Sequence, residues 1–321
     1  MATAPVSNPE IRIIPLANAD VVSLERLFDD ECDEWLELLK WDYRPASMLI
    51  RDVARQQQLA GVAAIVGNEV IGFAYYVIEG SRSSIGDIYV ARQWRDSGVD
   101  GDMAVATLDR LSRTRRLRRI ESQYVGLDNR RADRVFQEHG FERLERNYML
   151  ADLASVAPMH TSALADISIR PWQQIDFEQA ARVIHRSYRG KDDSRINSQY
   201  RSLHGCADLL TILTDHFWCG EFLPDVTMVA VRPSGALGGV LIASRVASGV
   251  GHLSQISVHP GNQGRGIGRR MIERAISKFR DLNYRSVTLA VTTSNTNALR
   301  LYESCGFRTT HTFPVFYRDR G

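Results

Sequence analysis

The chain reads Gln-Gly-Arg-Gly-Ile-Gly-Arg-Arg at residues 263–270, and this stretch decides the fold. It directly follows an apolar segment typical of a strand, 252–258, and it opens an amphipathic helix expected at about 267–279. Glycines let a backbone adopt positive φ and approach a ligand closely. Successive N–H groups at a helix N-terminus then point at one spot, which suits phosphate oxygens. The stretch predicts a binding loop for a polyanionic ligand, with a simple helix-capping turn as the alternative.

The spacing of these glycines differs from that of two common nucleotide-binding loops. The loop lacks the GxxxxGK[ST] pattern of a P-loop. It also lacks the GxGxxG spacing and the later acidic residue of a dinucleotide fold. The polyanion is therefore expected to differ from the nucleotides that P-loops and dinucleotide folds bind.

Four matches in the same order indicate that the chain carries one fold twice. The matching residues and their separations are Ile11 with Ile167 (156), Gly72 with Gly239 (167), Val90 with Val258 (168) and Gly140-Phe141 with Gly306-Phe307 (166). We expect one domain at 1–153, a linker at 154–166 and a second domain at 167–321. Each copy has the pattern of a mixed α/β fold, with a mixed central sheet flanked by helices. The separation grows from 156 to 167, so the second copy has about 11 extra residues, which we place near 188–220.

Composition narrows the function classes. The 321 residues have a formal net charge of +2 and are 44% apolar, as in an ordinary two-domain globular protein. Near-neutral charge argues against a nucleic-acid binder, and no apolar run is long enough to span a membrane. The first residues lack a signal-peptide layout, so a cytoplasmic location is expected. No metal site or disulfide framework is expected, because the cysteines are scattered without a CxxC pair: Cys32, Cys206, Cys219 and Cys305.

Two motifs resemble those of the GNAT acyltransferase family. Residues 263–268 match (Gln/Arg)-x-x-Gly-x-(Gly/Ala) after a strand, and residues 295–307 match Asn-x-x-Ala-x-x-Leu-Tyr-x-x-x-Gly-Phe. The resemblance is strong over 167–321 and weak over 11–150. The layout is similar to mycothiol synthase and other tandem GNAT proteins.

The resemblance implies that acetyl-CoA (coenzyme A) is the co-substrate. In this family the turn binds the pyrophosphate of coenzyme A, and the strand before it splays from its neighbour to pair with pantetheine. The N–H of Val258 would face the thioester oxygen, where a donor stabilises developing charge. Asn295 would hold the cofactor arm or only cap its helix. The cofactor-binding residues implied in this way are Ile256, Val258, Gln263, Gly264, Arg265, Gly266, Ile267, Gly268, Arg269 and Asn295.

The resemblance also assigns the two proton transfers. Tyr302 stands at the family's general-acid position, where its phenol would protonate the departing thiolate; the alternative is that it only packs beside Gly306-Phe307. Some members keep a glutamate eleven residues before the turn motif, and that position is His252 here. A histidine titrates near neutrality and would share a strand face with Ile256 and Val258. A purely structural histidine is the alternative, and Glu221 and Asp225 are weaker candidates for the base.

The acceptor is expected to be a primary amine. The extra residues of the second copy mix acids, bases and aromatic residues, among them Tyr188, Lys191, Asp192 and Asp193. The family shapes its acceptor site with this segment, and acids suit a cationic amine, although they equally suit a solvated loop. We expect an acetyl-CoA-dependent N-acetyltransferase that acts on a small-molecule amine by direct attack. A protein or peptide N-acetyltransferase and a non-catalytic coenzyme A-binding sensor or scaffold stay open, as does a homodimer.

The first copy has lost the residues that carry this chemistry. Alignment places Asp96 and Asp100 opposite Gly264 and Gly268, and carboxylates there would repel a pyrophosphate. Phe136 aligns with Tyr302, which removes the proton donor. The first copy is therefore expected to be degenerate and non-catalytic. Its arginine-rich stretch, 110–119, is interpreted as a solvated helix end, with contact to RNA or an acidic partner as the alternative.

Overall fold

The computed structural model describes residues 10–123, 130–156, 166–215 and 218–320. The chain divides into two compact units. Unit 1 comprises Met1–Glu34, Ser47–Arg143 and Pro314–Gly321, and unit 2 comprises Trp35–Ala46 and Leu144–Phe313.

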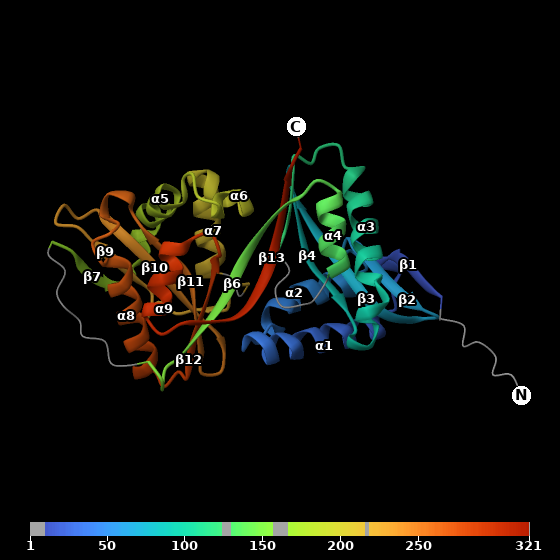
Figure 1. The fold of residues 1–321 in the computed structure, drawn as a ribbon, viewed down its shortest axis with the longest axis horizontal. Helices are drawn as coiled ribbons and strands as arrows, with labels where there is room; N and C mark the ends of the chain where they lie inside the picture. The colour runs from blue at the N-terminus through green and yellow to red at the C-terminus, as the bar shows by residue number, and fades with distance from the viewer. Residues whose placement is uncertain (1–9, 124–129, 157–165, 216–217, 321) are drawn as a thin grey trace, which may run out of the picture. The chain divides into compact units, whose positions relative to one another are not determined.

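Unit 1 is a mixed sheet with helices on both faces (Figure 1). The strands and helices of the first copy are β1 (Ile11–Pro15), α1 (Val21–Leu39), α2 (Arg44–Arg55), β2 (Gly61–Val66), β3 (Glu69–Glu79), β4 (Arg82–Val90), α3 (Val99–Ser112), β5 (Arg119–Ser122), α4 (Arg130–Glu138) and β6 (Glu142–Asp152). Strands β1 to β5 are neighbours in chain order, and only the β4–β5 pair is parallel. Helices α1 and α2 cover one face, and α3 and α4 cover the other.

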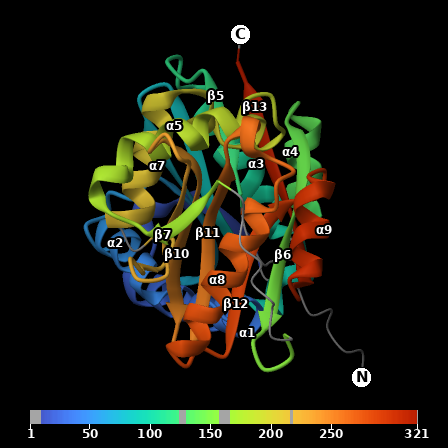
Figure 2. The same ribbon diagram turned by 90° about the vertical axis from the view of Figure 1, so that its left-hand side faces the viewer.

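Unit 2 repeats this architecture (Figure 2). The strands and helices of the second copy are β7 (Ser168–Pro171), α5 (Phe177–Tyr188), α6 (Asp193–Ile196), α7 (Leu203–Asp215), β8 (Glu221–Phe222), β9 (Met228–Val231), β10 (Leu237–Ala247), β11 (Val250–Val258), α8 (Ile267–Asp281), β12 (Ser286–Thr292), α9 (Thr296–Ser304) and β13 (Arg308–Asp319). The sheet order is β6-β12-β11-β10-β9-β7, and only the β11–β12 pair is parallel. Helices α5 and α7 cover one face and α8 and α9 the other, so the mixed α/β fold expected from the sequence is confirmed.

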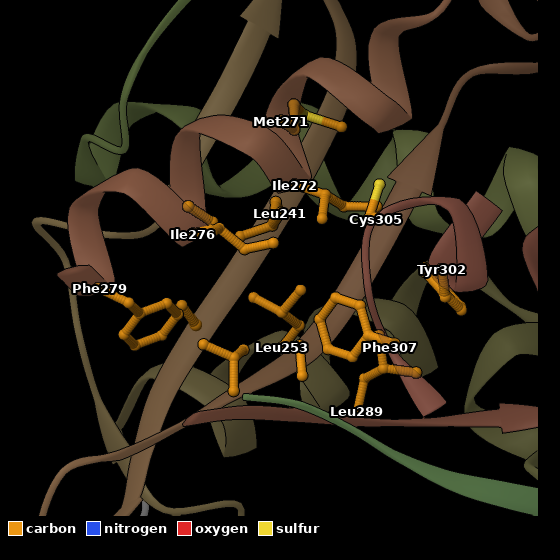
Figure 3. Packing of buried hydrophobic residues seen from close by; sticks show 14 of the residues in the cluster. Leu241, Leu253, Met271, Ile272, Ile276, Phe279, Leu289, Tyr302, Cys305 and Phe307 are labelled. Carbon is orange, nitrogen blue, oxygen red and sulfur yellow. The ribbon is translucent and has the colours of Figure 1, made fainter. Parts of the chain in front are cut away.

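The helix expected after the glycine loop is confirmed as α8. Its apolar positions recur at helical spacing and are all buried against the sheet: Ile267, Met271, Ile272, Ala275, Ile276 and Phe279. Figure 3 shows the α8 side chains meeting three strand residues, Leu241, Leu253 and Leu289. This packing fixes the direction in which the N-terminus of α8 points.

The matches found in the sequence are structurally equivalent. Gly72 pairs with Val90 across β3 and β4, and Gly239 pairs with Val258 across β10 and β11. A Cβ at either glycine would lie 3.0 Å from the Cε of a helix methionine, Met103 or Met271. The glycines therefore let α3 and α8 pack closely on their strands.

The structure divides the chain differently from the repeat boundary, because the last strand of each copy completes the other unit. Residues 146–152 of β6 pair antiparallel with β12 in unit 2. Residues 316–319 of β13 pair antiparallel with β5 in unit 1. The repeat marks where one copy of the sequence ends, but it carries no information about which sheet the last strand joins.

The extra residues of the second copy enter at two places. The separation is 156 at the starts of α1 and α5, 159 at the starts of α2 and α7, and 167 at the starts of β2 and β9. Residues 189–202 connect α5 and α7, whereas residues 40–43 connect α1 and α2. The longer connection contains α6 and a short 3₁₀ helix, Ser198–Arg201.

Candidate active site

A cavity of about 470 Å³ opens in unit 2 where β11 and β12 stop pairing. The two strands pair only over Val250–His252 and Ser286–Thr288. The N–H of His259 donates to the Gly238 carbonyl on the β10 side. Backbone groups alternate along a strand, so the N–H of Val258 points the other way, into the gap. The hydrogen-bond ladder between the two strands therefore stops after these paired residues, and the strands separate as the family resemblance implied.

The glycine loop forms one end of the cavity. Gly264 and Gly266 have φ of 75° and 77°, and Gly266 is the N-cap residue of α8. The Nε2 of Gln263 donates to the Val258 carbonyl at 3.0 Å, which ties the loop to the strand. Within the described chain, no protein acceptor is recorded for the backbone N–H groups from Gly264 to Arg269. These donors sit at a helix N-terminus and suit the pyrophosphate of coenzyme A.

Most of the predicted cofactor residues meet at this cavity. Its walls include Ile256, Val258, Gln263, Gly264, Gly266, Ile267, Gly268, Arg269, Asn295 and Tyr302. Arg265 is exposed and does not line it. Asn295 caps α9, because its Oδ1 accepts from the N–H of Ala298 at 3.3 Å, and it also lines the cavity, so both roles considered for it are compatible.

Tyr302 lies on α9 with its ring against Phe307, 6.1 Å between centroids (Figure 3). The residue is buried, at 9% exposure, yet it lines the cavity. Burial raises the pKa of the phenol well above its ordinary value, and the charge of Asp193 contributes. The phenol therefore keeps its proton at physiological pH, as a proton donor must. Among the described residues, no partner is recorded for its hydroxyl group.

His252 does not line the cavity, contrary to the role expected for it. Its ring packs against Trp41 and Tyr148, and its Nδ1 is hydrogen-bonded to Oγ1 of Thr288 at 2.9 Å. Burial lowers the pKa of His252 to about 3, with a further contribution from Arg146. His252 is thus buried and hydrogen-bonded outside the cavity lining, so its role as the base stays a prediction that this geometry does not favour.

A β-bulge explains why the face of His252 was misjudged. Across β10 and β11, Ala243 pairs with Leu253 and Ile242 pairs with Gln255, which leaves Ser254 as an extra residue. One extra residue reverses the alternation of side chains along a strand. His252 is therefore out of phase with Ile256, and its neighbour Leu253 lines the cavity instead.

The other two candidate bases lie elsewhere. Glu221 forms an ion pair with Arg245 on the neighbouring strand. Asp225 is exposed in the turn before β9. Neither lines the cavity.

The cavity lining also holds a polar aromatic cluster that sequence reasoning did not assemble. The rings of Tyr188 and Tyr200 stack with centroids 4.0 Å apart. Gln255 joins them, accepting from the Tyr200 hydroxyl at 2.9 Å and donating to the Tyr188 hydroxyl at 3.0 Å. Burial raises the pKa of both phenols. The pattern of the extra segment indicated the aromatic residues, but only the fold brings Gln255 to them.

Charged residues complete this cluster. Asp193 on α6 and Arg146 on β6 both line the cavity, and their charges act on the same three phenols, those of Tyr188, Tyr200 and Tyr302. Arg146 comes from the first copy of the sequence and reaches unit 2 on the exchanged strand. Nothing in the sequence alone indicated that it belongs here.

Comparisons with known proteins agree with this geometry. The model of the acetyltransferase (GNAT) family matches residues 22–141 and 197–307. The chain therefore belongs to the GNAT family as a tandem protein, and the family places it among N-acyltransferases.

Individual relatives match less completely. Over 59 residues the chain is 34% identical to the L-amino acid N-acyltransferase MnaT of Escherichia coli K12, a match that covers 18% of this chain and 34% of that protein. A GCN5-related N-acetyltransferase from Sphaerobacter thermophilus has a TM-score of 0.67 at 17% identity, over 97% of this chain and 95% of that chain. A tandem GNAT protein from the clavulanic acid biosynthesis pathway has a TM-score of 0.58 at 14% identity, over 97% of this chain and 99% of that chain. At such identities the two structures show a shared fold alone.

Over the described ranges, no group of three or more His, Cys, Asp or Glu residues is arranged to hold a metal ion. In the same part of the chain, no helix is both long and apolar enough to cross a bilayer.

Proposed function

We propose that unit 2 is an acetyl-CoA-dependent N-acetyltransferase that transfers an acetyl group to a primary amine by direct attack. The observation that carries this proposal is one cavity with uncommitted backbone N–H groups at Gly264–Arg269 and a buried, protonated phenol at Tyr302. Phosphate oxygens fit the first feature and a leaving thiolate fits the second.

The chain's own residues would divide the work as follows. The N–H groups of the loop and the first turn of α8 hold the pyrophosphate, and the strand groups at Ile256 and Val258 orient the arm. Bound there, acetyl-CoA supplies a thioester carbon that an amine can attack. The Val258 N–H faces the gap and stabilises charge on the carbonyl oxygen. Tyr302 donates its proton to the departing sulfur.

The acceptor we favour is a small molecule. The segment 187–200 lines the cavity, whose volume of about 470 Å³ suits a small amine beside the cofactor arm. The relative from Escherichia coli, whose printed name is an amino acid N-acyltransferase, supports the same choice. A cytoplasmic location stays a prediction.

We also propose that unit 1 is non-catalytic. Phe136 occupies the position of Tyr302 and is stacked on Phe316, with centroids 4.8 Å apart. Asp100, opposite Gly268, is buried and hydrogen-bonded within the unit.

The test is thiol release from acetyl-CoA by the purified chain with a panel of primary amines, with products identified by mass spectrometry. Tyr302→Phe should lower kcat by about 100-fold or more, the usual range for a lost acid or base, and leave coenzyme A binding unchanged. Tyr284→Phe, a tyrosine of unit 2 outside the cavity, is the matched control. Absence of thiol release with every amine, or an unchanged kcat in Tyr302→Phe, would contradict the proposal.

A further inference from the structure

The cavity contains a single carboxylate among the described residues that line it, that of Asp193. The residue opens α6, inside the connection between α5 and α7, which is longer than the connection between α1 and α2 in the first copy. It is buried, at 8% exposure. A buried carboxylate is costly unless a partner compensates its charge, so its partners are informative.

One oxygen of Asp193 has a neutral partner. Its Oδ1 accepts from Oγ1 of Thr292 at 2.8 Å, at the end of β12. Among the described residues, no donor is recorded for Oδ2, and no salt bridge to Asp193 is recorded. The carboxylate is therefore oriented by the protein without being neutralised by a recorded ion pair.

The turn that carries Asp193 is anchored. The Oδ2 of Asp192 accepts from the Ser294 hydroxyl at 2.6 Å, and the N–H of Ile196 donates to the Asp192 carbonyl at 3.2 Å. These bonds tie α6 to the loop after β12. A carboxylate on an anchored turn can hold a ligand in one place.

Aromatic side chains line the space around this carboxylate. Tyr188, Tyr200 and Tyr302 all line the cavity, and the first two are fixed by stacking and by Gln255. Aromatic rings and a carboxylate in one cavity form a setting that attracts an organic ammonium group.

We propose that Asp193 binds the ammonium group of the acceptor and takes its proton, so that the substrate of unit 2 is a small amine that arrives positively charged. This inference rests on the proposed acetyl transfer. It assigns the base to a residue of the longer connection and not to strand β11.

The transfer balances with the residues present. Asp193 accepts one proton from the ammonium, and the nitrogen lone pair then forms the C–N bond. The C–S bond breaks, and the sulfur takes the Tyr302 proton. Tyr302 recovers a proton from the new amide nitrogen, and Asp193 releases its proton to solvent. The products are the N-acetyl amine, free thiol and one proton.

Asp193→Asn is the sharpest variant, because an asparagine oxygen can still accept from Thr292 while the charge is lost. Asp208→Asn on the exposed side of α7 makes the same chemical change away from the cavity and serves as the matched control. We expect Asp193→Asn to lower kcat/KM for alkylamines by about 30- to 5,000-fold, the range for removing one partner of a buried charge pair, with acetyl-CoA affinity unchanged.

A neutral nucleophile shows whether Asp193 acts through its charge on the ammonium group or only supports the structure of the site. O-methylhydroxylamine is unprotonated at neutral pH, so it needs neither the ion pair nor the first proton transfer. Its slower acetylation should therefore fall much less in Asp193→Asn than that of n-butylamine. Equal losses for both nucleophiles, or no loss for either, would overturn the proposal.

Binding supplies a readout that does not depend on turnover. Phenethylammonium titrated into the chain saturated with coenzyme A should bind, and about tenfold or more weakly in Asp193→Asn, as for other charged hydrogen bonds. Absence of binding to the unaltered chain, or equal affinity in the variant, also overturns the assignment of Asp193. Failure of acetyl transfer with intact, Asp193-dependent binding would instead contradict the proposed function.

Discussion

The loop that follows β4 in unit 1 and the loop that follows β11 in unit 2 have closely similar backbones. Each starts with a 3₁₀ turn, Arg92–Ser97 or Pro260–Asn262, and each starts its helix at a left-handed glycine. The φ values are 84° at Gly98 and 77° at Gly266. Each also ties a side chain to the last strand carbonyl, from Arg95 to Val90 at 3.1 Å and from Gln263 to Val258 at 3.0 Å.

What fills the two loops differs. In unit 1, Oδ2 of Asp100 accepts from the N–H groups of Arg131 and Ala132, at 3.0 and 2.9 Å, so a protein carboxylate caps α4. The Arg131 side chain also lies directly against Gly98. In unit 2, Gly268 has no side chain and α9 is capped by its own Asn295. The fold thus preserves the loop's backbone while its side chains change. The loop of unit 1 is occupied by the protein's own Asp100 and Arg131, whereas Gly268 places no side chain in the loop of unit 2.

Placing an equivalent carboxylate in the loop of unit 2 should change coenzyme A binding more than any other substitution considered below. Gly268→Asp is expected to weaken coenzyme A binding by about 100-fold or more, since like charges about 4 Å apart near a protein surface repel by roughly 4 kcal/mol. Gly268→Ala is the control, because a Cβ there would lie at an ordinary 3.4 Å from Leu301 Cδ2. Isothermal titration of both variants checks this, and tight binding by Gly268→Asp would break the comparison.

The strand before each loop differs in a second way, which predicts a pH effect on stability. Asp87 of β4 aligns with Gln255 of β11 and is buried beside Glu31 of α1. Burial raises the pKa of Asp87 from 3.8 to about 7, and burial beside Asp87 raises that of Glu31. The folded chain thus holds protons that the unfolded chain releases, so its stability falls as pH rises through about 7.

Asp87→Asn should remove this loss. We expect the variant to gain about 2–3 kcal/mol of unfolding free energy over the unaltered chain between pH 5 and pH 8. Urea unfolding at both pH values measures it. Asp102→Asn on the exposed face of α3 is the matched control. A gain that is the same at both pH values would show that the acid pair does not hold its proton.

Removing the internal cap should destabilise unit 1 without creating a site. Asp100→Ala is expected to lower the unfolding free energy by about 1–2 kcal/mol, the range for a lost helix cap. Phe136 and Arg131 remain in place, so no coenzyme A site is expected to appear. Calorimetric unfolding and ligand titration of the same sample test both parts, and a newly gained site would mean that Asp100 alone blocks the loop.

Removing the corresponding helix cap in unit 2, Asn295, should have the smallest effect on stability and binding. Asn295→Ala is expected to cost about 1 kcal/mol of stability and to weaken coenzyme A binding modestly, since Asn295 also lines the cavity. Thr296→Ala, on the exposed side of the same turn, is the control. Unchanged stability would show that the 3.3 Å bond to Ala298 contributes little.

Local patterns in the sequence were enough to predict the repeated fold and the glycine turn that opens α8. Glycine conformations, apolar spacing on α8 and the motif around Tyr302 are all properties of contiguous segments, so they are visible without a structure. The pairs Gly72–Val90 and Gly239–Val258 show that the residues matched between the copies occupy equivalent places in the two sheets.

The rest depends on long-range placement. The exchange of β6 and β13 brings Arg146 into unit 2, and no local pattern specifies which sheet a strand joins. His252 was placed on the wrong face because a bulge at Ser254 shifts the alternation by one residue. Asp193 was one of several acids in a segment of mixed composition, and only the fold shows that it alone lines the cavity.

The number of coenzyme A molecules bound per chain shows whether unit 2 alone holds the cofactor. Isothermal titration of the full chain should give one site, and Gly268→Asp should remove it. Two sites per chain, or one site that survives in Gly268→Asp, would contradict the claim that only the loop of unit 2 binds the cofactor.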